Sequence, residues 1–219
     1  MELQVVQPQR GSLLGRLVNK LHSLWMAWTY PFISVGRNFS AHYSCDLRRP
    51  TASRVKIGDS VILERDSWLN IPTIPASMDP VILIGDHCRL GRRCVISAKN
   101  RIDIERNVIF GPSALVMDHN HSFEDVTAPI SQQGVTPGGT IRIEEGSWIG
   151  YGAAVICNQG ELVIGRNSVI GANSVLTRSV PPNSVVTGNP ARVVKQFDHA
   201  KGQWVLGSSS LAVATAQSK

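Results

Sequence analysis

The sequence of 219 residues is poor in aromatic side chains, in paired cysteine motifs and in long apolar runs. Aromatic residues make up 6% of the chain whereas hydrophobic residues make up 42%, so its core must consist mainly of Val, Ile and Leu. Its four cysteines are Cys45, Cys88, Cys94 and Cys157. Because none of them forms a CxxC pair, the spacing argues against zinc-finger and thioredoxin-like sites and favours free thiols in a reducing cytoplasm.

Membrane-spanning and nucleic-acid-binding patterns are missing as well. We find no apolar run of transmembrane length and no signal-peptide cleavage pattern. The formal net charge of +6 suits a nucleic acid, an anionic membrane surface or a phosphorylated cofactor. Basic and aromatic residues do not interleave as in RNA-binding sheets, and no helix-turn-helix pattern is present, so we expect no nucleic-acid partner. We expect a cytoplasmic protein, with a peripheral position on the inner face of the membrane as the alternative.

Residues 12–30 have a helical period. The apolar positions at three- and four-residue spacing are Leu14, Leu17, Val18, Leu21, Leu24, Trp25 and Trp28. This spacing predicts an amphipathic helix with tryptophans on its apolar face. The apolar stripe either packs against the domain or a sister subunit, which is the interpretation we prefer, or contacts a membrane surface.

The dominant pattern is an aliphatic residue at every sixth position. The runs are Ile57, Leu63 and Leu69; Ile84, Leu90 and Ile96; Ile104, Phe110 and Val116; Ile143, Ile149 and Val155; Ile164, Ile170 and Leu176; and a weaker run of Val35, Ala41 and Leu47. An α-helix would need a period of 3.6, and an ordinary antiparallel strand would need strict alternation. A six-residue period instead suits a short strand followed by a corner of small or polar residues. Stacked three-sided coils would bury one continuous column of these positions, so the sequence predicts an all-β, left-handed parallel β-helix.

The repeat also divides the chain. We predict an N-terminal helical segment at residues 1–32, the β-helix at 33–197 and a disordered tail at 198–219. Insertions are expected at corners, since an insertion within a face would displace the stacked positions. They fall at residues 72–80, 117–140 and 157–161. After Leu176 the prolines predict the end of regular strand pairing, and from Gly202 onward Trp204 alone is expected to dock.

Three segments carry a resemblance to a known family. The segments WIGYGAAV, IGANSVLTRSVPPNSVVTGNPARVVK and MDHNHSF resemble the hexapeptide acyltransferase superfamily. Within it the chain is similar to galactoside, maltose and nodulation-factor O-acetyltransferases, and to polysaccharide-cluster members with a DHxH loop. The resemblance covers residues 33–197. It implies a homotrimer that binds acetyl-CoA between neighbouring β-helices and acetylates a hydroxyl of a sugar or polysaccharide precursor.

The resemblance places the catalytic base on the loop that begins DHNH. The matching residue is His119, and His121 is the second candidate, as a base or as an acceptor contact. A histidine can take the hydroxyl proton and return it to the leaving thiolate. Its ring must be held in one tautomer by a carbonyl or carboxylate, for which Asp118, Glu124 and Asp125 are candidates and Asp118 is our choice.

The same resemblance implies the residues that bind the cofactor, without a metal ion. Tyr151 and Gly152 are expected to offer backbone N–H groups to the oxyanion. The other expected contacts are Trp148, Ala172, Thr177 and Arg178, together with Arg192 and Lys195 at the ribose phosphate.

The predicted acceptor site departs from that of the small-saccharide enzymes. Gly91 and Lys99 stand where those enzymes have an asparagine and an acidic residue, and Arg92 and Arg93 lie on the same coil. Losing the polar sugar contacts argues against a small neutral saccharide. The added cations suggest a larger, anionic or lipid-linked acceptor.

Two other functions remain open on sequence alone. The first is a zinc enzyme similar to the β-helical carbonic anhydrases, in which His87, His119 and His121 would bind the metal. Those enzymes differ from this chain because their paired histidines are five residues apart rather than two, and because they lack the GNPARV segment. An inactive scaffold of polysaccharide biosynthesis is the other alternative. A nucleophilic Cys157 is disfavoured because no histidine accompanies it at a recognisable spacing.

Overall fold

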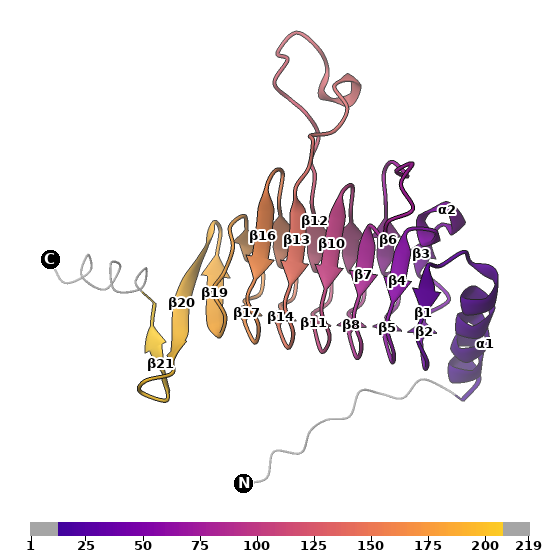
Figure 1. The fold of residues 1–219 in the computed structure, drawn as a ribbon, viewed down its shortest axis with the longest axis horizontal. Helices are drawn as coiled ribbons and strands as arrows, with labels where there is room; N and C mark the ends of the chain where they lie inside the picture. Colours follow the sequence, from indigo (N-terminus) through magenta and orange to yellow (C-terminus); the bar gives the residue numbers. More distant parts are fainter. Residues whose placement is uncertain (1–12, 208–219) are drawn as a thin grey trace, which may run out of the picture.

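The computed structural model describes residues 13–207, which form an elongated stack of short parallel strands with a helix at one end (Figure 1). The predicted helix start at Ser12 and the end of the predicted tail, residues 208–219, lie outside the described residues. The elements that position the site are the strands and the corners between them.

The strands form three sheets, which we name A, B and C. Sheet A contains β1 (Ser34–Val35), β4 (Val55–Ile57), β7 (Ile82–Ile84), β10 (Arg101–Ile104), β13 (Thr140–Ile143) and β16 (Glu161–Ile164). Sheet B contains β2 (Ser40–Ala41), β5 (Ile62–Leu63), β8 (Arg89–Leu90), β11 (Ile109–Phe110), β14 (Trp148–Ile149), β17 (Val169–Ile170), β19 (Ser184–Gly188), β20 (Ala191–Asp198) and β21 (Gln203–Leu206). Sheet C contains β3 (Asp46–Leu47), β6 (Trp68–Asn70), β9 (Val95–Ser97), β12 (Leu115–Met117), β15 (Ala154–Ile156) and β18 (Val175–Leu176). Within the repeat, neighbours in a sheet are three strands apart in sequence, so each turn of the chain contributes one strand to each side.

The six-residue repeat forms the core of this stack. Within sheet A, for example, Ile57 pairs with Ile84, which pairs with Ile104, and the column continues through Ile143 and Ile164. Every residue of the five strong runs is at most 2% exposed. Each buried aliphatic side chain stabilises the fold by about 1.5–3 kcal/mol relative to an exposed one. The predicted all-β, parallel architecture is therefore confirmed, while its left-handed winding stays a prediction.

We name each corner by the sheets that flank it. The A–B and B–C corners are tight turns in which polar residues adopt positive φ, such as His87 (59°), Arg93 (58°) and Asn173 (55°). The additional chain gathers at C–A corners: helix α2 (Arg49–Ala52), residues 71–81, residues 118–139 and residues 157–160. Figure 1 shows the segment between β12 and β13 projecting from this edge. One edge of the stack thus carries most of the irregular structure.

The end of the repeat differs from the prediction. Strand pairing does not stop at Leu176, because Val180 bridges to Ile164 and β19 then pairs in parallel with β17. Pro181 and Pro182 fall in the A–B corner before β19, so neither proline occupies a strand position that needs an N–H donor.

The predicted disorder of the tail is wrong over its first part. Strand β20 continues to Asp198, and Gln203–Leu206 forms β21, which pairs antiparallel with β20. Trp204 does dock, with its ring in edge contact with Phe197 at a centroid distance of 5.7 Å. Strand β21 completes the backbone hydrogen bonds of β20. The six-residue period could not predict this pairing, because backbone hydrogen bonds do not require a repeated side chain.

Helix α1 (Leu13–Thr29) lies at the N-terminal end of the stack, but it packs with the face opposite to the one predicted. Its buried residues are Ser23 and Met26. The Ser23 hydroxyl accepts a hydrogen bond from the Ala41 N–H at 2.9 Å and lies 3.2 Å from the Ala41 carbonyl. These contacts satisfy backbone groups of β2 at the open end of sheet B. The expectation that the apolar stripe packs on the chain's own domain is therefore wrong. Separately, no helix among residues 13–207 is long and apolar enough to cross a membrane.

Candidate functional site

The projecting segment of residues 118–139, which we name the arm, has an ordered base. The Gly139 N–H donates to the Asp118 carbonyl at 2.7 Å, and the Thr136 N–H donates to the Asn120 carbonyl at 2.7 Å. His121 and Val135 form an antiparallel bridge one step further out. A short 3-10 helix, Ile130–Gln132, lies beyond this ladder. The two chains of the arm therefore leave the stack as a paired stem.

Asp118 anchors the arm to the preceding coil. Its side chain is fully buried, and its carboxylate accepts hydrogen bonds from the backbone N–H groups of Lys99 (2.7 Å), Asn100 (2.8 Å) and Arg101 (2.9 Å). A buried carboxylate is costly unless it is fully hydrogen-bonded, and bonds to a charged acceptor are each worth about 1.5–3 kcal/mol. Asp118 therefore fixes the position at which the arm begins.

The same carboxylate orients His119. The His119 Nδ1 atom lies 2.9 Å from Asp118 Oδ1, and the histidine is 6% exposed. Because an ionised carboxylate can only accept, Nδ1 must carry a proton, and in the neutral ring Nε2 is then the basic nitrogen. Among residues 13–207 we find no hydrogen-bond partner for Nε2. The histidine is thus held in the tautomer that a general base requires.

The other acidic residues of the arm have different partners. Glu124 accepts a hydrogen bond from the Phe123 N–H. The Thr127 hydroxyl and N–H both donate to Asp125 and lower the pKa of that carboxyl. Of the three candidates, Asp118 is therefore the residue that contacts His119.

His121 occupies a different environment from His119. It is exposed, and its Nδ1 atom lies 3.3 Å from the Gly134 carbonyl across the arm's stem. A carbonyl oxygen can only accept, so this contact also favours a proton on Nδ1, but it is longer than the His119–Asp118 contact and no carboxylate of the described residues contacts the His121 ring.

The expected group of cations for an anionic acceptor does not form within one chain. The Lys99 ammonium donates to the Thr136 carbonyl and so braces the arm's stem. Arg92 and Arg93 are exposed at a B–C corner, at the other end of β9. At Gly91 a Cβ would lie 2.6 Å from the Phe110 carbonyl oxygen, so this position cannot hold a sugar-binding side chain. The prediction of one cationic acceptor pocket is corrected accordingly.

The predicted cofactor residues lie on two edges of the stack. Tyr151, Gly152 and Ala172 are at B–C corners, whereas Thr177 and Arg178 follow β18 at the C–A edge, the edge of the arm. Trp148 points outward from β14 and is 51% exposed, and Arg192 and Lys195 are exposed on β20. A single chain therefore does not bring Ala172 and His119 to one corner.

One of the two expected oxyanion donors is already used. The Gly152 N–H donates to the Pro112 carbonyl at 3.0 Å as part of the corner stacking. It cannot point at a bound oxyanion while that bond is made, so the expectation for Gly152 is corrected. The six-residue repeat could have revealed this contact, because equivalent corners stack on one another. The stacking places the Gly152 N–H against the Pro112 carbonyl of the preceding coil.

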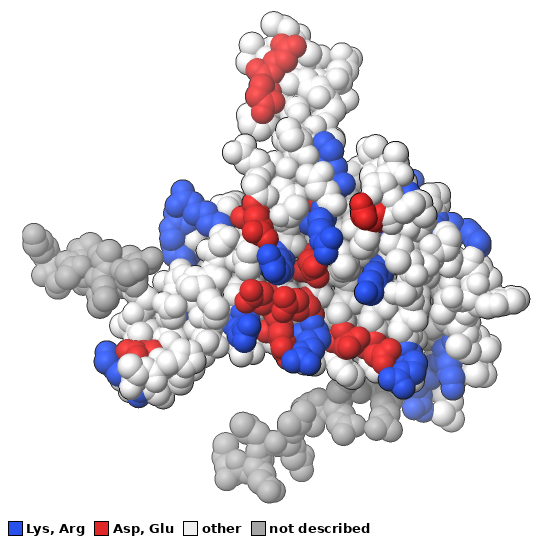
Figure 2. Space-filling model, in the orientation of Figure 1, with Lys and Arg blue, Asp and Glu red and all other residues white. Residues whose placement is uncertain are grey.

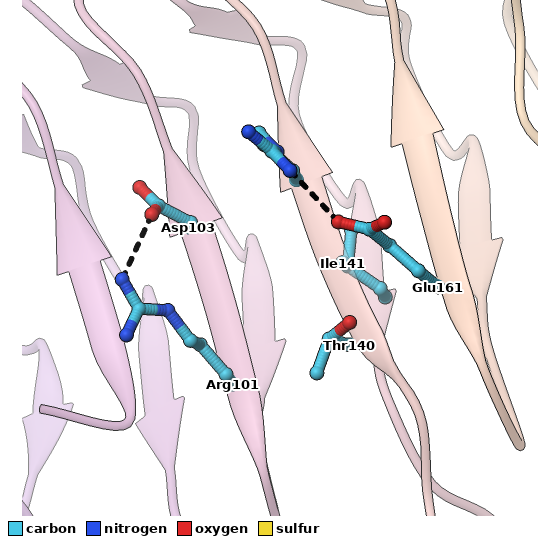
Figure 3. Close-up of a pocket in the computed structure, with 6 residues that line it drawn as sticks. Arg101, Asp103, Thr140, Ile141 and Glu161 are labelled. Carbon is cyan, nitrogen blue, oxygen red and sulfur yellow. Dashed lines mark hydrogen bonds and ion pairs between the residues drawn. The ribbon is translucent and has the colours of Figure 1, made fainter. Parts of the chain in front are cut away.

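A groove of about 250 Å³ lies on the outer face of sheet A, close to the base of the arm (Figure 3). Two ion pairs line it, Arg101–Asp103 at 3.2 Å and Arg142–Glu161 at 2.9 Å. Figure 2 shows that positive and negative side chains intermingle over this face. The charges of the groove are already paired with one another. The groove shares Arg101 with the Asp118 anchor but does not include His119, so it is separate from the candidate base.

The cysteines are poor nucleophiles in this structure. Burial raises the pKa of Cys45, Cys88 and Cys94 to about 11. Burial also raises the pKa of Cys157, whose Sγ lies 3.3 Å from the Gln159 carbonyl. A protonated thiol is a weak nucleophile, which argues against covalent catalysis by Cys157.

The described residues also bear on the zinc alternative. Among residues 13–207 no group of three or more His, Cys, Asp or Glu side chains is arranged to hold a metal ion. His87 lies at an A–B corner, away from the edge that carries His119 and His121.

Comparison with known proteins adds sequence relatives, although no family model matches the chain. A protein of Escherichia coli K12 provisionally named lipopolysaccharide biosynthesis O-acetyl transferase WbbJ is 27% identical over 57% of this chain and 65% of its own length. A protein of Mycobacterium tuberculosis named as a probable acetyltransferase is 33% identical over 61% of this chain and 44% of its own. The chain thus spans less than two thirds of the length of either relative.

Solved structures share the fold. The N-acyltransferase AntD of Bacillus cereus, in complex with dTDP and coenzyme A, matches with a TM-score of 0.63 and 17% identity over 86% of this chain and 93% of that one. GDP-perosamine N-acetyl transferase of Caulobacter crescentus, in complex with CoA and GDP-perosamine, matches with a TM-score of 0.50 and 19% identity over 82% and 64%. The chain is thus similar in sequence to proteins named as acetyltransferases and shares its fold with solved acyltransferases.

Proposed function

We propose that the protein is an acetyl-CoA-dependent transferase that acetylates a hydroxyl of a sugar or polysaccharide precursor, with His119 as the general base. One observation carries the proposal. The buried carboxylate of Asp118, held by three backbone N–H groups, fixes the Nδ1-protonated tautomer of His119 and leaves Nε2 basic.

The reaction needs one proton shuttle and no covalent enzyme intermediate. As the acceptor oxygen attacks the thioester carbonyl, Nε2 of His119 takes the hydroxyl proton, and the carbonyl becomes a tetrahedral oxyanion. When the oxyanion collapses, the C–S bond breaks and the imidazolium returns the proton to the leaving thiolate. The products are the acetyl ester and coenzyme A. The Asp118 carboxylate stabilises the transient imidazolium throughout.

The relatives support both proposed substrates, acetyl-CoA and a sugar-containing acceptor. The names of the sequence relatives specify acetyl transfer, and one of them specifies O-acetyl transfer in lipopolysaccharide biosynthesis. The two structural neighbours were crystallised with coenzyme A together with a nucleotide or nucleotide sugar. Because those neighbours are N-acyltransferases, an amino sugar must be tested against a hydroxyl acceptor.

Outward apolar rows support a site that is shared between copies of the chain. On sheet B, Ile109 and Trp148 pair in register and are each 51% exposed. On sheet C the outward row is Trp68, Val95, Leu115, Ala154 and Val175. The Arg89–Glu64 ion pair interrupts the sheet B row, and sheet A carries the Arg101–Asp103 and Arg142–Glu161 pairs. We infer that sheets B and C face other copies in a homotrimer of left-handed β-helices.

In such an assembly the B–C corner of one copy would face the arm of another. His119 would then meet an acetyl-CoA bound along Ala172 and the Tyr151 N–H of the neighbour. The exposed apolar side chains of the arm, Phe123 (63%), Val126 (95%) and Ile130 (55%), would contact that neighbour. Arg192 and Lys195, exposed on β20, would bind the phosphates of coenzyme A.

An acetyl-transfer assay that follows thiol release tests the proposal. The acceptors are neutral sugars, uronic acids, nucleotide sugars and amino sugars. We expect transfer to a hydroxyl acceptor, and His119→Ala should lower turnover by about 10²–10⁴ while acetyl-CoA still binds. His121→Ala is the matched control and should cost clearly less. A larger loss from His121→Ala would contradict the assignment of the base, and acceptance of amino sugars alone would contradict O-acetylation.

A further inference from the structure

Helix α1 exposes a continuous apolar surface, which we name the outer stripe. It consists of Leu13, Leu14, Leu17, Val18, Leu21, Leu24, Trp25 and Trp28, which are between 41% and 89% exposed. At about 100° per residue these side chains occupy one arc of about 140° on the helix. Isolated apolar residues are common on protein surfaces, but a contiguous stripe of this size marks an interaction site.

The helix uses its other face to hold the stack. Ser23 and Met26 are buried, and the Asn19 side-chain carbonyl accepts a hydrogen bond from the Tyr43 N–H at 3.4 Å. The polar residues of an amphipathic helix normally face water and the apolar residues face the core. In α1 this arrangement is inverted. Residues 13–207 of the same chain leave the outer stripe exposed, so we look for a partner other than these residues.

The charges beside the outer stripe identify the kind of partner. Arg16 and Lys20 are exposed and lie between the stripe and the packed face, and the helix contains no Asp or Glu. Beyond its last turn, the Arg49 guanidinium donates to the Thr29 carbonyl and adds a third cation. Two tryptophans, Trp25 and Trp28, stand at the same end. Apolar residues with tryptophans, flanked on the same helix by Arg16 and Lys20 and by no acidic residue, suit the interface of an anionic bilayer.

We propose that α1 lies flat in the headgroup region of a membrane that contains anionic lipids. The outer stripe enters the acyl boundary, while Arg16 and Lys20 pair with lipid phosphates. A second copy of the helix is a poorer partner, because it would bring the same cations together and offer no carboxylate. Figure 1 shows α1 at the end of the stack opposite β20 and β21, with the arm projecting to the side. The bound helix therefore leaves the arm in water.

The test is sedimentation of the full-length protein with vesicles of phosphatidylcholine, with and without phosphatidylglycerol. We expect binding to the anionic vesicles that weakens as salt rises, since the cation–phosphate attraction is screened. The double variant Leu17→Gln/Trp28→Gln should reduce the bound fraction at least about tenfold, because each apolar side chain contributes to insertion. Arg16→Gln/Lys20→Gln should remove the preference for anionic over neutral vesicles.

Met78→Gln is the matched control, since Met78 is 74% exposed but lies in the loop between β6 and β7. It should bind vesicles like the wild type, and thermal unfolding should show that all variants are folded. Absence of vesicle binding by the wild type would overturn the proposal. So would unchanged binding by Leu17→Gln/Trp28→Gln. An assembly that this variant dissociates, in a protein that ignores vesicles, would assign the outer stripe to a second copy instead.

Discussion

Asp118 shows how one residue can join fold and chemistry. Its carboxylate closes three backbone hydrogen bonds to the preceding coil and also holds the Nδ1 of His119. The sequence indicates an acid beside a histidine but not these partners, which lie 17 to 19 residues upstream and are adjacent only because coils stack. For the same reason the stem contact of Lys99 with Thr136 could not be predicted.

The variant Asp118→Asn separates this residue from ordinary surface acids. An amide cannot accept from all four donors, and its NH₂ group would reverse the His119 tautomer or oppose a backbone N–H. We expect a loss of about 1–3 kcal/mol in unfolding free energy and a turnover at least about a hundredfold lower. Asp103→Asn, which removes a partly exposed ion pair with Arg101, should change stability by less than about 1 kcal/mol. Equal behaviour of the two variants in urea unfolding and turnover would contradict the role given to Asp118.

Because of its buried thiols, we expect the free energy of unfolding of the protein to fall at alkaline pH. Burial raises the pKa of Cys88 and Cys94 from 9.0 to about 11, so the folded state binds these protons more tightly than the unfolded state does. The stability from this difference is complete below pH 9 and is lost as pH rises from 9 to about 11. Urea unfolding between pH 8 and 11 measures it. The double variant Cys88→Ala/Cys94→Ala should lose less stability over this range than the wild type, and a parallel decline in both proteins would contradict the assignment.

At the scale of elements, the six-residue period predicts nearly all of the stack because each aliphatic position buries against its equivalents above and below. The period ends near Leu176, and the strands beyond β19 carry no such signal. Strands β20 and β21 pair antiparallel through backbone bonds that need no repeat. The prediction for the packed face of α1 is also wrong, because a hydrophobic stripe does not reveal that Ser23 satisfies the open edge of β2.

The repeat makes a direct prediction about stability. Ile104→Ala removes a side chain that is 1% exposed in the middle of the sheet A column, so it loses transfer free energy and leaves a cavity. We expect a loss of about 2–5 kcal/mol in the free energy of unfolding. Met78→Ala, at a position 74% exposed in the loop between β6 and β7, should change it by less than about 0.5 kcal/mol. Chemical denaturation of both variants checks this, and a small effect of Ile104→Ala would contradict a core made of stacked columns.

On the scale of the whole molecule, the outer faces differ in a way that predicts assembly. Sheet A carries paired charges, whereas sheet C presents an apolar row and sheet B an apolar row that the Arg89–Glu64 ion pair interrupts. We expect a homotrimer of about three times 23.8 kDa in analytical sedimentation. Ile109→Asp places a charge in the sheet B row and should dissociate it, whereas Lys56→Asp, on sheet A, should not. A monomeric wild type at micromolar concentration, or dissociation by Lys56→Asp alone, would contradict this.

The proposed active site combines a catalytic base and an acetyl-CoA groove that come from different copies of the chain. A mixture of two inactive variants tests this sharing. One is His119→Ala, and the other is Ala172→Arg, which blocks the groove at the B–C corner. Purified assemblies that contain both chains are assayed for thiol release from acetyl-CoA with the best acceptor. We expect partial recovery of activity, because some sites combine an intact arm with an intact groove, whereas mixed assemblies as inactive as either variant alone would contradict the shared site.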